Sequence, residues 1–154
     1  MIRIGILGDI GSGKSYLSKN FGYPVFNADE EVSKLYKTDK KIFKKLKKIL
    51  PKYFNSFPID KNNVLRAILA NNNNFNKIIK IVHSKIRKKL QIFLIKNKRK
   101  KIVILDIPLL LENTINKKND VLIFVQSKKF EISKRLKNRS IFNKKLIKKF
   151  RMIQ

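Results

Sequence analysis

The residues best suited to chemistry are GDIGSGKS at positions 8–15, a run of glycines that ends in lysine and a hydroxyl residue. The glycines permit backbone conformations that a Cβ atom forbids, and they let amide N–H groups approach a phosphate closely. Lys14 is expected to reach the β- and γ-phosphates of a nucleotide, and the Ser15 hydroxyl to ligate Mg²⁺. The residues expected to bind ATP here are Gly8, Gly11, Ser12, Gly13, Lys14, Ser15 and Tyr16.

A phosphate-binding loop needs a strand before it and a helix after it. Residues 2–7, IRIGIL, are apolar and β-branched, which predicts a buried strand. A helix is expected from about residue 15 to Phe21, with Leu17 and Phe21 on one face and Gly22 at its end. The alternative, a glycine-rich turn that binds no phosphate, does not require this strand and helix.

Composition indicates a soluble protein of one domain, because 154 residues are enough for a hydrophobic core. The absence of Cys excludes disulfides and thiolate metal sites, and no apolar run reaches the ~18 residues of a membrane span. No signal peptide is visible, so we expect a cytoplasmic location. The net charge of +28 predicts weak, salt-sensitive nucleic-acid binding. Its spread along a chain rich in Lys, Asn and Ile favours a simpler interpretation, in which an A/T-rich coding bias makes Lys the default residue of solvated faces.

The rest of the chain alternates strand and helix patterns, which predicts an α/β fold with a parallel sheet. Further strands are expected at 23–26, 102–105 and 121–125, and the continuous apolar runs of the last two are typical of parallel strands buried on both faces. Helices are expected at 30–36, 40–50, 62–70, 75–95, 128–139 and 143–152, with a break at 71–74.

Several motifs follow the loop in an order that resembles dephospho-CoA kinase, the last enzyme of coenzyme A biosynthesis. They are NAD at 27–29, LR at 65–66, HSKI at 83–86, LDIPLLLEN at 105–113 and SKRLKNR at 133–139. The resemblance covers essentially the whole chain, and the phosphate loop and DIPLL-x-E are its sharpest parts.

This resemblance implies transfer of the γ-phosphoryl group of ATP to the ribose 3′-hydroxyl of dephospho-CoA. It also implies a P-loop NTPase fold, adenylate-kinase-like, with three α/β/α layers and with the strand that ends in Asp106 between the second strand and the central first strand. The chain would be a single kinase domain, 1–154. Its core would span 1–37 and 96–126, a CoA-binding helical region about 38–95, and a partial lid about 127–154.

Positions that match the family's motifs give candidate functional residues. There are two candidate catalytic residues, Asp29 and Lys14. Asp29 would accept the 3′-hydroxyl proton or orient that hydroxyl. Asp106, at the end of a buried strand, would hold Mg²⁺ through water. Arg135 and Arg139 would close over the ATP phosphates. The candidates for binding dephospho-CoA are Asp29, Arg66, His83, Pro108 and Leu109.

Each of these side chains also has a structural interpretation. Asp29 is suited to cap the following helix, and Asp106 to accept hydrogen bonds at a strand end. The candidate arginines are equally well explained as exposed basic side chains. His83 lies near the apolar stripe of its helix, so we expect it to be structural or to contact substrate rather than to act as an acid or base.

Departures from the family pattern concern CoA recognition more than ATP binding. Asn27 stands where the family has the first of two aspartates, Asn62 where an arginine is common, and Ser84 where it has proline. The chain also stops inside the expected lid, which predicts a missing last edge strand, an exposed apolar edge at 121–125 and weak or lost activity.

Two other functions fit the residues. The first is a P-loop kinase of another small acceptor, such as a nucleoside monophosphate. The second is a basic nucleic-acid-binding protein without catalysis. The fold by itself does not separate these functions, because phosphate-loop folds serve many reactions.

Overall fold

The computed structural model describes residues 1–107 and 119–137 of the chain. The chain divides into two compact units, one of Met1–Ala28 with Phe93–Gln154 and the other of Asp29–Ile92. We call them the sheet unit and the helical unit. Within the described ranges, no helix has both the length and the apolar character needed to cross a membrane.

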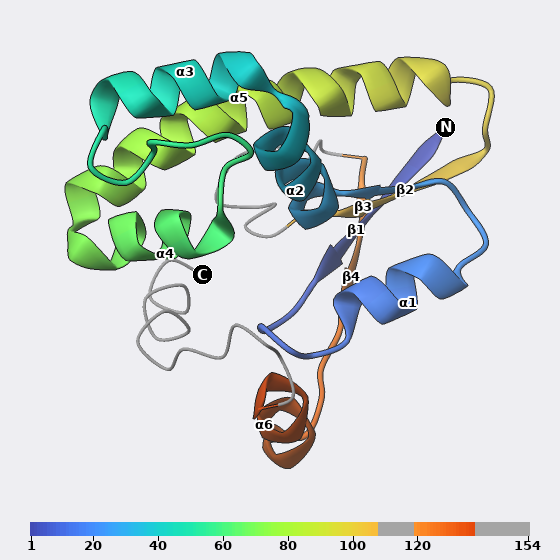
Figure 1. Cartoon of the computed structure of the whole chain (residues 1–154). Helices are drawn as coiled ribbons and strands as arrows, with labels where there is room; N and C mark the ends of the chain where they lie inside the picture. The colour runs from blue at the N-terminus through green and yellow to red at the C-terminus, as the bar shows by residue number, and fades with distance from the viewer. Residues whose placement is uncertain (108–118, 138–154) are drawn as a thin grey trace. The chain divides into compact units, whose positions relative to one another are not determined.

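The sheet unit is built on four parallel strands, β1 (Ile2–Leu7), β2 (Val25–Asn27), β3 (Ile102–Asp106) and β4 (Val121–Phe124). Their order is β2-β3-β1-β4, as Figure 1 shows. The prediction that β3 lies between the second and first strands is therefore confirmed. Because all four strands are parallel, their carboxyl ends lie at one edge of the sheet, where open α/β sheets bind ligands.

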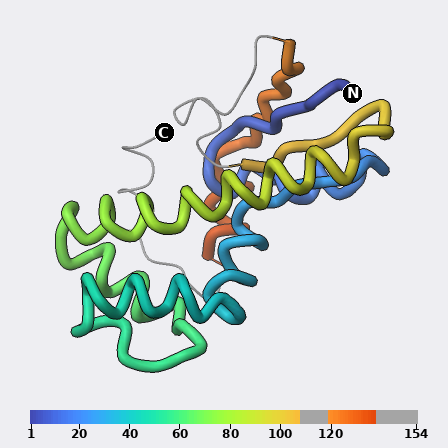
Figure 2. Tube along the Cα trace, turned by 90° about the horizontal axis from the view of Figure 1, so that it is seen from above, coloured from blue at the N-terminus to red at the C-terminus, as the bar shows by residue number. Residues whose placement is uncertain are grey.

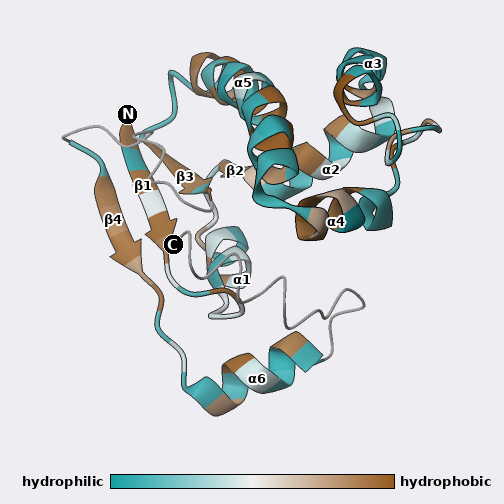
Figure 3. Ribbon diagram, turned by 90° about the vertical axis from the view of Figure 1, so that its left-hand side faces the viewer, coloured by the Kyte–Doolittle hydropathy of each residue, from teal (hydrophilic) through white to brown (hydrophobic). Residues whose placement is uncertain are grey.

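The two long apolar runs of the sheet differ in burial. In β3, Val103, Ile104 and Leu105 are fully buried, which confirms the expectation from their sequence. In β4, Leu122 is 41% exposed and Phe124 is 68% exposed, so the expectation of burial on both faces is wrong for this strand. Figure 3 shows β4 as a hydrophobic strand at the end of the described order. This exposure agrees with the expected apolar edge.

An ion pair fixes the start of β4 to β1. The Arg3 guanidinium lies 3.0 Å from the Asp120 carboxylate, with side-chain exposures of 9% and 4%. Arg3 is on β1 and Asp120 directly precedes β4. A charge pair this deeply buried is costly to break, because removing one partner takes a paired opposite charge away from the other.

Two helices lie entirely within the described part of the sheet unit. The first, α1 (Lys14–Asn20), contacts β1, β2 and β3, and Gly22 follows it with a φ of +71°. Glycine adopts this left-handed conformation without strain, which explains why the helix ends here. The second, α6 (Lys129–Lys137), buries Ile132 and Leu136 and exposes its basic side chains.

The helical unit contains α2 (Ala28–Thr38), α3 (Lys40–Ile49), α4 (Lys61–Ala70) and most of α5 (Asn72–Lys96). Figure 2 shows α5 as a long continuous helix. Ion pairs from Lys85 to Asp39 (3.3 Å) and from Lys89 to Glu31 (2.8 Å) join α5 to the start of α3 and to α2. The buried side chains recur at helical spacing, as the sequence predicted. They include Leu35, Ile42, Leu46, Ala67, Ile78, Val82 and Ile86.

Polar residues define the ends of these helices. Asp39 caps α3 by accepting hydrogen bonds from the backbone N–H groups of Lys41 and Ile42. Asn71 separates α4 from α5, and its side chain accepts from the N–H of Asn74 at 2.8 Å. The predicted break at 71–74 is therefore wrong in length, because residues 72–74 already belong to α5. A single capping side chain is enough to start the new helix.

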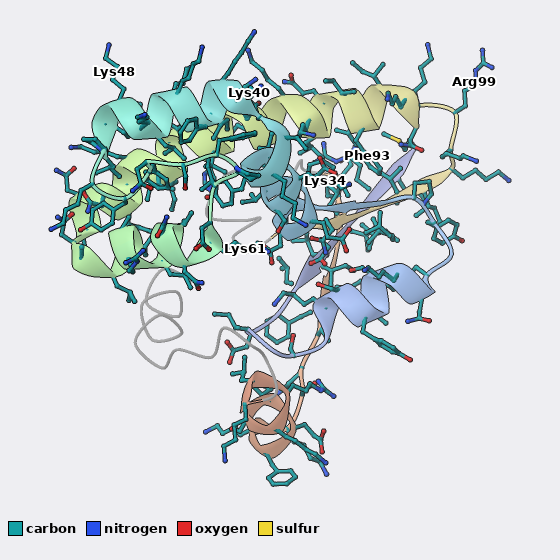
Figure 4. The ribbon with its side chains drawn as sticks, in the orientation of Figure 1. Lys34, Lys40, Lys48, Lys61, Phe93 and Arg99 are labelled. Atoms are coloured by element: carbon teal, nitrogen blue, oxygen red, sulfur yellow. The ribbon has the colours of Figure 1, made fainter. Side chains whose placement is uncertain are left out.

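The surface of α3 is strongly basic. Ile42 and Leu46 are buried against the core, and six of the ten residues of the helix are lysine. Figure 4 shows Lys40 and Lys48 pointing away from the unit. The charged residues of α3 thus form a solvated face, which is the simpler interpretation that the sequence offered for its lysines.

Candidate functional site

The loop between β1 and α1 has the backbone that the motif predicted. Gly8, Gly11 and Gly13 have φ values of +140°, +85° and +102°, which L-residues with a Cβ rarely adopt. The N–H of Ser12 donates to the carbonyl of Asp9 at 3.1 Å, which closes a turn inside the loop. The loop then enters α1 at Lys14, one residue before the predicted start.

Close packing is a second reason why position 8 requires glycine. A Cβ at this position would lie 2.3 Å from the carbonyl oxygen of Val125 and 2.9 Å from the Ser12 hydroxyl. Ser12 is 2% exposed, and its hydroxyl has no hydrogen-bond partner in the part of the chain that the structure describes. The loop, the Ser12 side chain and the end of β4 therefore fit together only when position 8 has no side chain.

The ammonium group of Lys14 lies over the loop. It donates to the carbonyl oxygens of Gly8 at 2.6 Å and of Asp9 at 2.8 Å. The cation is thus held by the same loop whose amides are expected to bind phosphate. A P-loop lysine in this place is suited to contact the terminal phosphates of a nucleotide.

Ser15, Asn27 and Asp106 come together at the carboxyl edge of the sheet. The side-chain amide of Asn27, at the end of β2, donates to Asp106 at 2.7 Å and lies 3.5 Å from the Ser15 hydroxyl. Asp106 is 3% exposed, so its carboxylate is held in a buried, hydrogen-bonded position. Sequence reasoning treated Asn27 only as a departure from the family pattern and missed this bond, because nothing in the sequence indicates which side chain faces Asp106.

These residues fit a magnesium ion. Within residues 1–107 and 119–137, no group of three acidic, histidine or cysteine side chains gathers in one place. Mg²⁺ does not need such a cluster, because it binds one or two carboxylates together with substrate phosphates and water. Asp106 and Ser15 offer a carboxylate and a hydroxyl beside the phosphate loop, which is the donor set expected for Mg²⁺ held by a nucleotide.

Asp29 lies two residues after Asn27, in the first turn of α2. The helix already includes Ala28, so Asp29 is inside the helix rather than at the cap that its structural interpretation required. Its side chain is exposed. With Glu30 and Glu31 it places negative charge at the helix N-terminus, where the helix dipole stabilises anions.

Ser127 and Arg135 contact the carbonyl groups of the loop. Ser127 donates to the carbonyl oxygen of Ser12 at 2.7 Å, and Arg135 donates to the carbonyl oxygens of Gly11 and Ser12 at 3.3 and 3.2 Å. Arg135 was expected to face the ATP phosphates, and the structure places its guanidinium on loop carbonyls. Sequence reasoning did not identify Ser127, because no motif marks it.

Two candidate substrate residues lie on the helical unit. Arg66 is exposed on α4 and donates a hydrogen bond to the side chain of Asn63. His83 is partly buried on α5, and this desolvation, together with the nearby Arg87 charge, lowers the pKa of its imidazole. A neutral His83 therefore prevails at pH 7.

A hollow of about 430 Å³ follows one face of α5 beside His83. Its described lining residues recur three or four positions apart, as one helix face requires. They are Lys80, His83, Ser84, Arg87, Lys88 and Gln91. The hollow is basic and polar, which suits an anionic ligand.

Three predicted site residues, Pro108, Leu109 and Arg139, lie outside the described residues, as does the helix expected at 143–152.

Comparisons with known proteins agree with this geometry. The family model of dephospho-CoA kinase matches residues 2–154. The chain is 35% identical to dephospho-CoA kinase of Wolbachia sp. subsp. Brugia malayi over 148 residues, which cover 93% of this chain and 76% of that one. It is 34% identical to dephospho-CoA kinase of Wolbachia pipientis wMel, with the same coverage. It is 30% identical to the enzyme of the same name from Ehrlichia canis, covering 92% of this chain and 74% of that one.

A solved structure also has a fold similar to that of this chain. A crystal structure of a protein from Thermus thermophilus superposes with a TM-score of 0.75 and 25% sequence identity. The match covers 99% of this chain and 80% of that chain. The parallel sheet and the loop after β1 thus have the P-loop NTPase fold that the sequence predicted.

Proposed function

Because the chain belongs to the dephospho-CoA kinase family, we propose that it transfers the γ-phosphoryl group of ATP to the 3′-hydroxyl of dephospho-CoA, giving CoA and ADP. It is an ATP-dependent kinase by this membership. The observation that carries the proposal is the geometry of the loop of Gly8–Ser15, which has three glycines at positive φ and a lysine folded over it. This geometry is suited to binding phosphate. Neither alternative function is favoured by the comparisons.

In this proposal the loop binds the phosphates of ATP through its amide groups, and Lys14 adds positive charge to them. Ser15 and Asp106 would hold Mg²⁺, which neutralises charge on the β- and γ-phosphates when bound. Asn27 supports Asp106 by donating to its carboxylate. The remaining candidates, Ser12, Tyr16, Arg135 and Arg139, stay proposed contributors to the ATP site.

Asp29 is the proposed base for the acceptor hydroxyl. It follows Asn27 by two residues, and Asn27 is bonded to the proposed metal ligand Asp106. Its exposed carboxylate lies in the first turn of α2. It would accept the 3′-hydroxyl proton or orient that hydroxyl toward the γ-phosphate.

Dephospho-CoA is proposed to bind the helical unit. The basic hollow along α5 is suited to the negatively charged phosphates of this substrate, and His83 lies in its lining. Arg66, Pro108 and Leu109 remain proposed substrate contacts. In this interpretation the residues of about 38–95 are the CoA-binding region of a single kinase domain, and those after about 127 belong to its lid.

We also propose a cytoplasmic location, since coenzyme A biosynthesis uses soluble substrates. Weak binding to nucleic acid is proposed from the net charge of +28. It is expected to vanish at moderate salt, because it depends on the displacement of counterions.

The test is ADP release from ATP and dephospho-CoA, measured in a coupled assay. We expect turnover by the wild type, and loss of ATP affinity in Lys14→Ala. Asp29→Asn should lower kcat about 10²- to 10⁴-fold with little change in KM for ATP, which is the range for a lost general base. The matched control is Glu30→Gln, which removes the neighbouring exposed charge and should keep activity. No turnover by a folded wild type that binds ATP would contradict the proposed acceptor.

A further inference from the structure

The outer side of the phosphate loop is covered by α6. A Cβ on Gly11 would lie 3.2 Å from the Leu136 side chain and 3.3 Å from Ile132, so the helix packs directly on the loop backbone. Leu136 and Ile132 are both buried. This apolar contact sets the distance between loop and helix, and it brings the polar side chains next to it within reach of the loop carbonyls.

The polar contacts form a closed set of four hydrogen bonds. The Ser127 hydroxyl donates to the Ser12 carbonyl at 2.7 Å and accepts from the Arg135 guanidinium at 3.2 Å. Arg135 also donates to the carbonyls of Ser12 and Gly11. A hydroxyl has one proton to donate and lone pairs to accept with, so both bonds of Ser127 are satisfied together.

The peptide bond transmits this contact to the inner side of the loop. A planar trans peptide places the C=O of one residue and the N–H of the next on opposite sides. Holding the Ser12 carbonyl toward Ser127 therefore turns the Gly13 N–H away from α6. Amide groups aligned in this way are what a phosphate-binding loop presents to an anion.

From these contacts we propose that Ser127 is a positioning residue of the nucleotide site. Together with Arg135 it fixes the Gly11 and Ser12 carbonyls and thereby aims the Gly13 N–H at the phosphates of the nucleotide. This inference rests on the proposed function of the loop. Ser127 acts through the loop backbone and does not itself contact the nucleotide.

The test compares Ser127→Ala with two control variants by isothermal titration with ADP and with inorganic tripolyphosphate. Loss of the hydroxyl removes one hydrogen bond and weakens that of Arg135, so affinity for both ligands should fall about fivefold, the factor for one lost bond. Ser127→Thr keeps the hydroxyl and should restore binding. Ser133→Ala removes an exposed hydroxyl of the same helix and should bind as the wild type does.

The effect should appear in the KM for ATP and leave kcat unchanged, because the reacting groups are intact. Hydrogen exchange of the loop peptide should be faster in Ser127→Ala while peptides of the helical unit exchange as in the wild type, which separates a loosened loop from general unfolding. Combining Ser127→Ala with Arg135→Ala should cost less than the product of the single losses, because the two side chains share the Ser12 carbonyl.

Unchanged affinity for ADP and tripolyphosphate in Ser127→Ala would overturn this inference and leave the proposed function standing. So would exchange of the loop amides at the wild-type rate. A wild type that binds ADP and tripolyphosphate but does not phosphorylate dephospho-CoA would instead overturn the proposed acceptor and leave the role of Ser127 standing.

Discussion

Replacing Gly8 by alanine tests whether the loop is built as tightly as its geometry indicates. The substitution adds a Cβ 2.3 Å from the Val125 carbonyl oxygen, well inside van der Waals contact. That carbonyl has little freedom to move, because the N–H of the same residue donates to Leu7 at 2.8 Å and closes the end of the β1–β4 ladder. Either the loop or the end of β4 has to give way.

The expected cost has two parts. A φ of +140° in a residue with a side chain costs about 1–3 kcal/mol. Displacing Val125 from its backbone hydrogen bond adds about 1 kcal/mol. The sum, about 2–4 kcal/mol, is a large fraction of the about 5–15 kcal/mol that stabilises a domain. The free energy of unfolding should fall by this amount in urea titrations, and ADP affinity should fall with it.

Gly22→Ala is the matched control. Gly22 also has a positive φ, +71°, but a Cβ there meets no atom within 4 Å. Its cost should be limited to backbone strain of about 1–2 kcal/mol, and ADP affinity should be unchanged. Equal losses of stability in the two variants, or an unchanged ADP affinity in Gly8→Ala, would refute the argument from close packing.

Two further predictions concern charge. Asp120→Ala removes the carboxylate that is paired with the buried Arg3 guanidinium and should cost about 3–5 kcal/mol in urea unfolding. The apolar double variant Arg3→Met with Asp120→Leu should lose much less stability, and equal losses in both would contradict this. Burial of Glu31 raises the pKa of its carboxyl, but hydrogen bonds from Lys34 and Lys89 outweigh burial and lower it below its usual 4.5. A lowered pKa means that this carboxylate stabilises the fold above pH 4.5 and that the stabilisation is lost as pH falls through the folded pKa. In Lys89→Met the free energy of unfolding should therefore fall less steeply as the pH is lowered from 5 to 3. An unchanged pH dependence of the unfolding free energy would show that the ion pair contributes nothing.

The sequence allowed much of the sheet unit to be predicted, because its signals are local. Glycines at fixed spacing, a β-branched strand and a following helix are all contained in residues 2–21. The burial of β3 followed from a continuous apolar run. The order of the strands was not a local signal, and it was available only through the resemblance to a family.

The errors came from effects that local patterns do not report. The predicted break at 71–74 was too long. A run of four asparagines is typical of a loop, but here the side chain of Asn71 alone caps the next helix. The apolar run of β4 did not predict its exposure, because the sequence of such a run is the same whether or not other elements cover the strand.

The candidate site also combines residues that a local motif predicts with contacts that no local pattern predicts. Lys14 and Ser15 were identified from the motif alone. The bond of Asn27 to Asp106 and that of Ser127 to Ser12 join residues 79 and 115 positions apart, so no window of the sequence contains both partners. Arg135 was predicted to contact ATP phosphates, and its contact with loop carbonyls depends on how α6 packs on Gly11.

The central place of β1 also bears on how the protein is made. Both neighbours of this strand are synthesised much later than the strand itself, since Ile4 pairs with Ile104 on one side and with Val121 on the other. Contacts this distant along the chain are slow to form. The nascent β1 segment therefore has to wait, with its apolar side chains uncovered, until residues 102–124 have been synthesised.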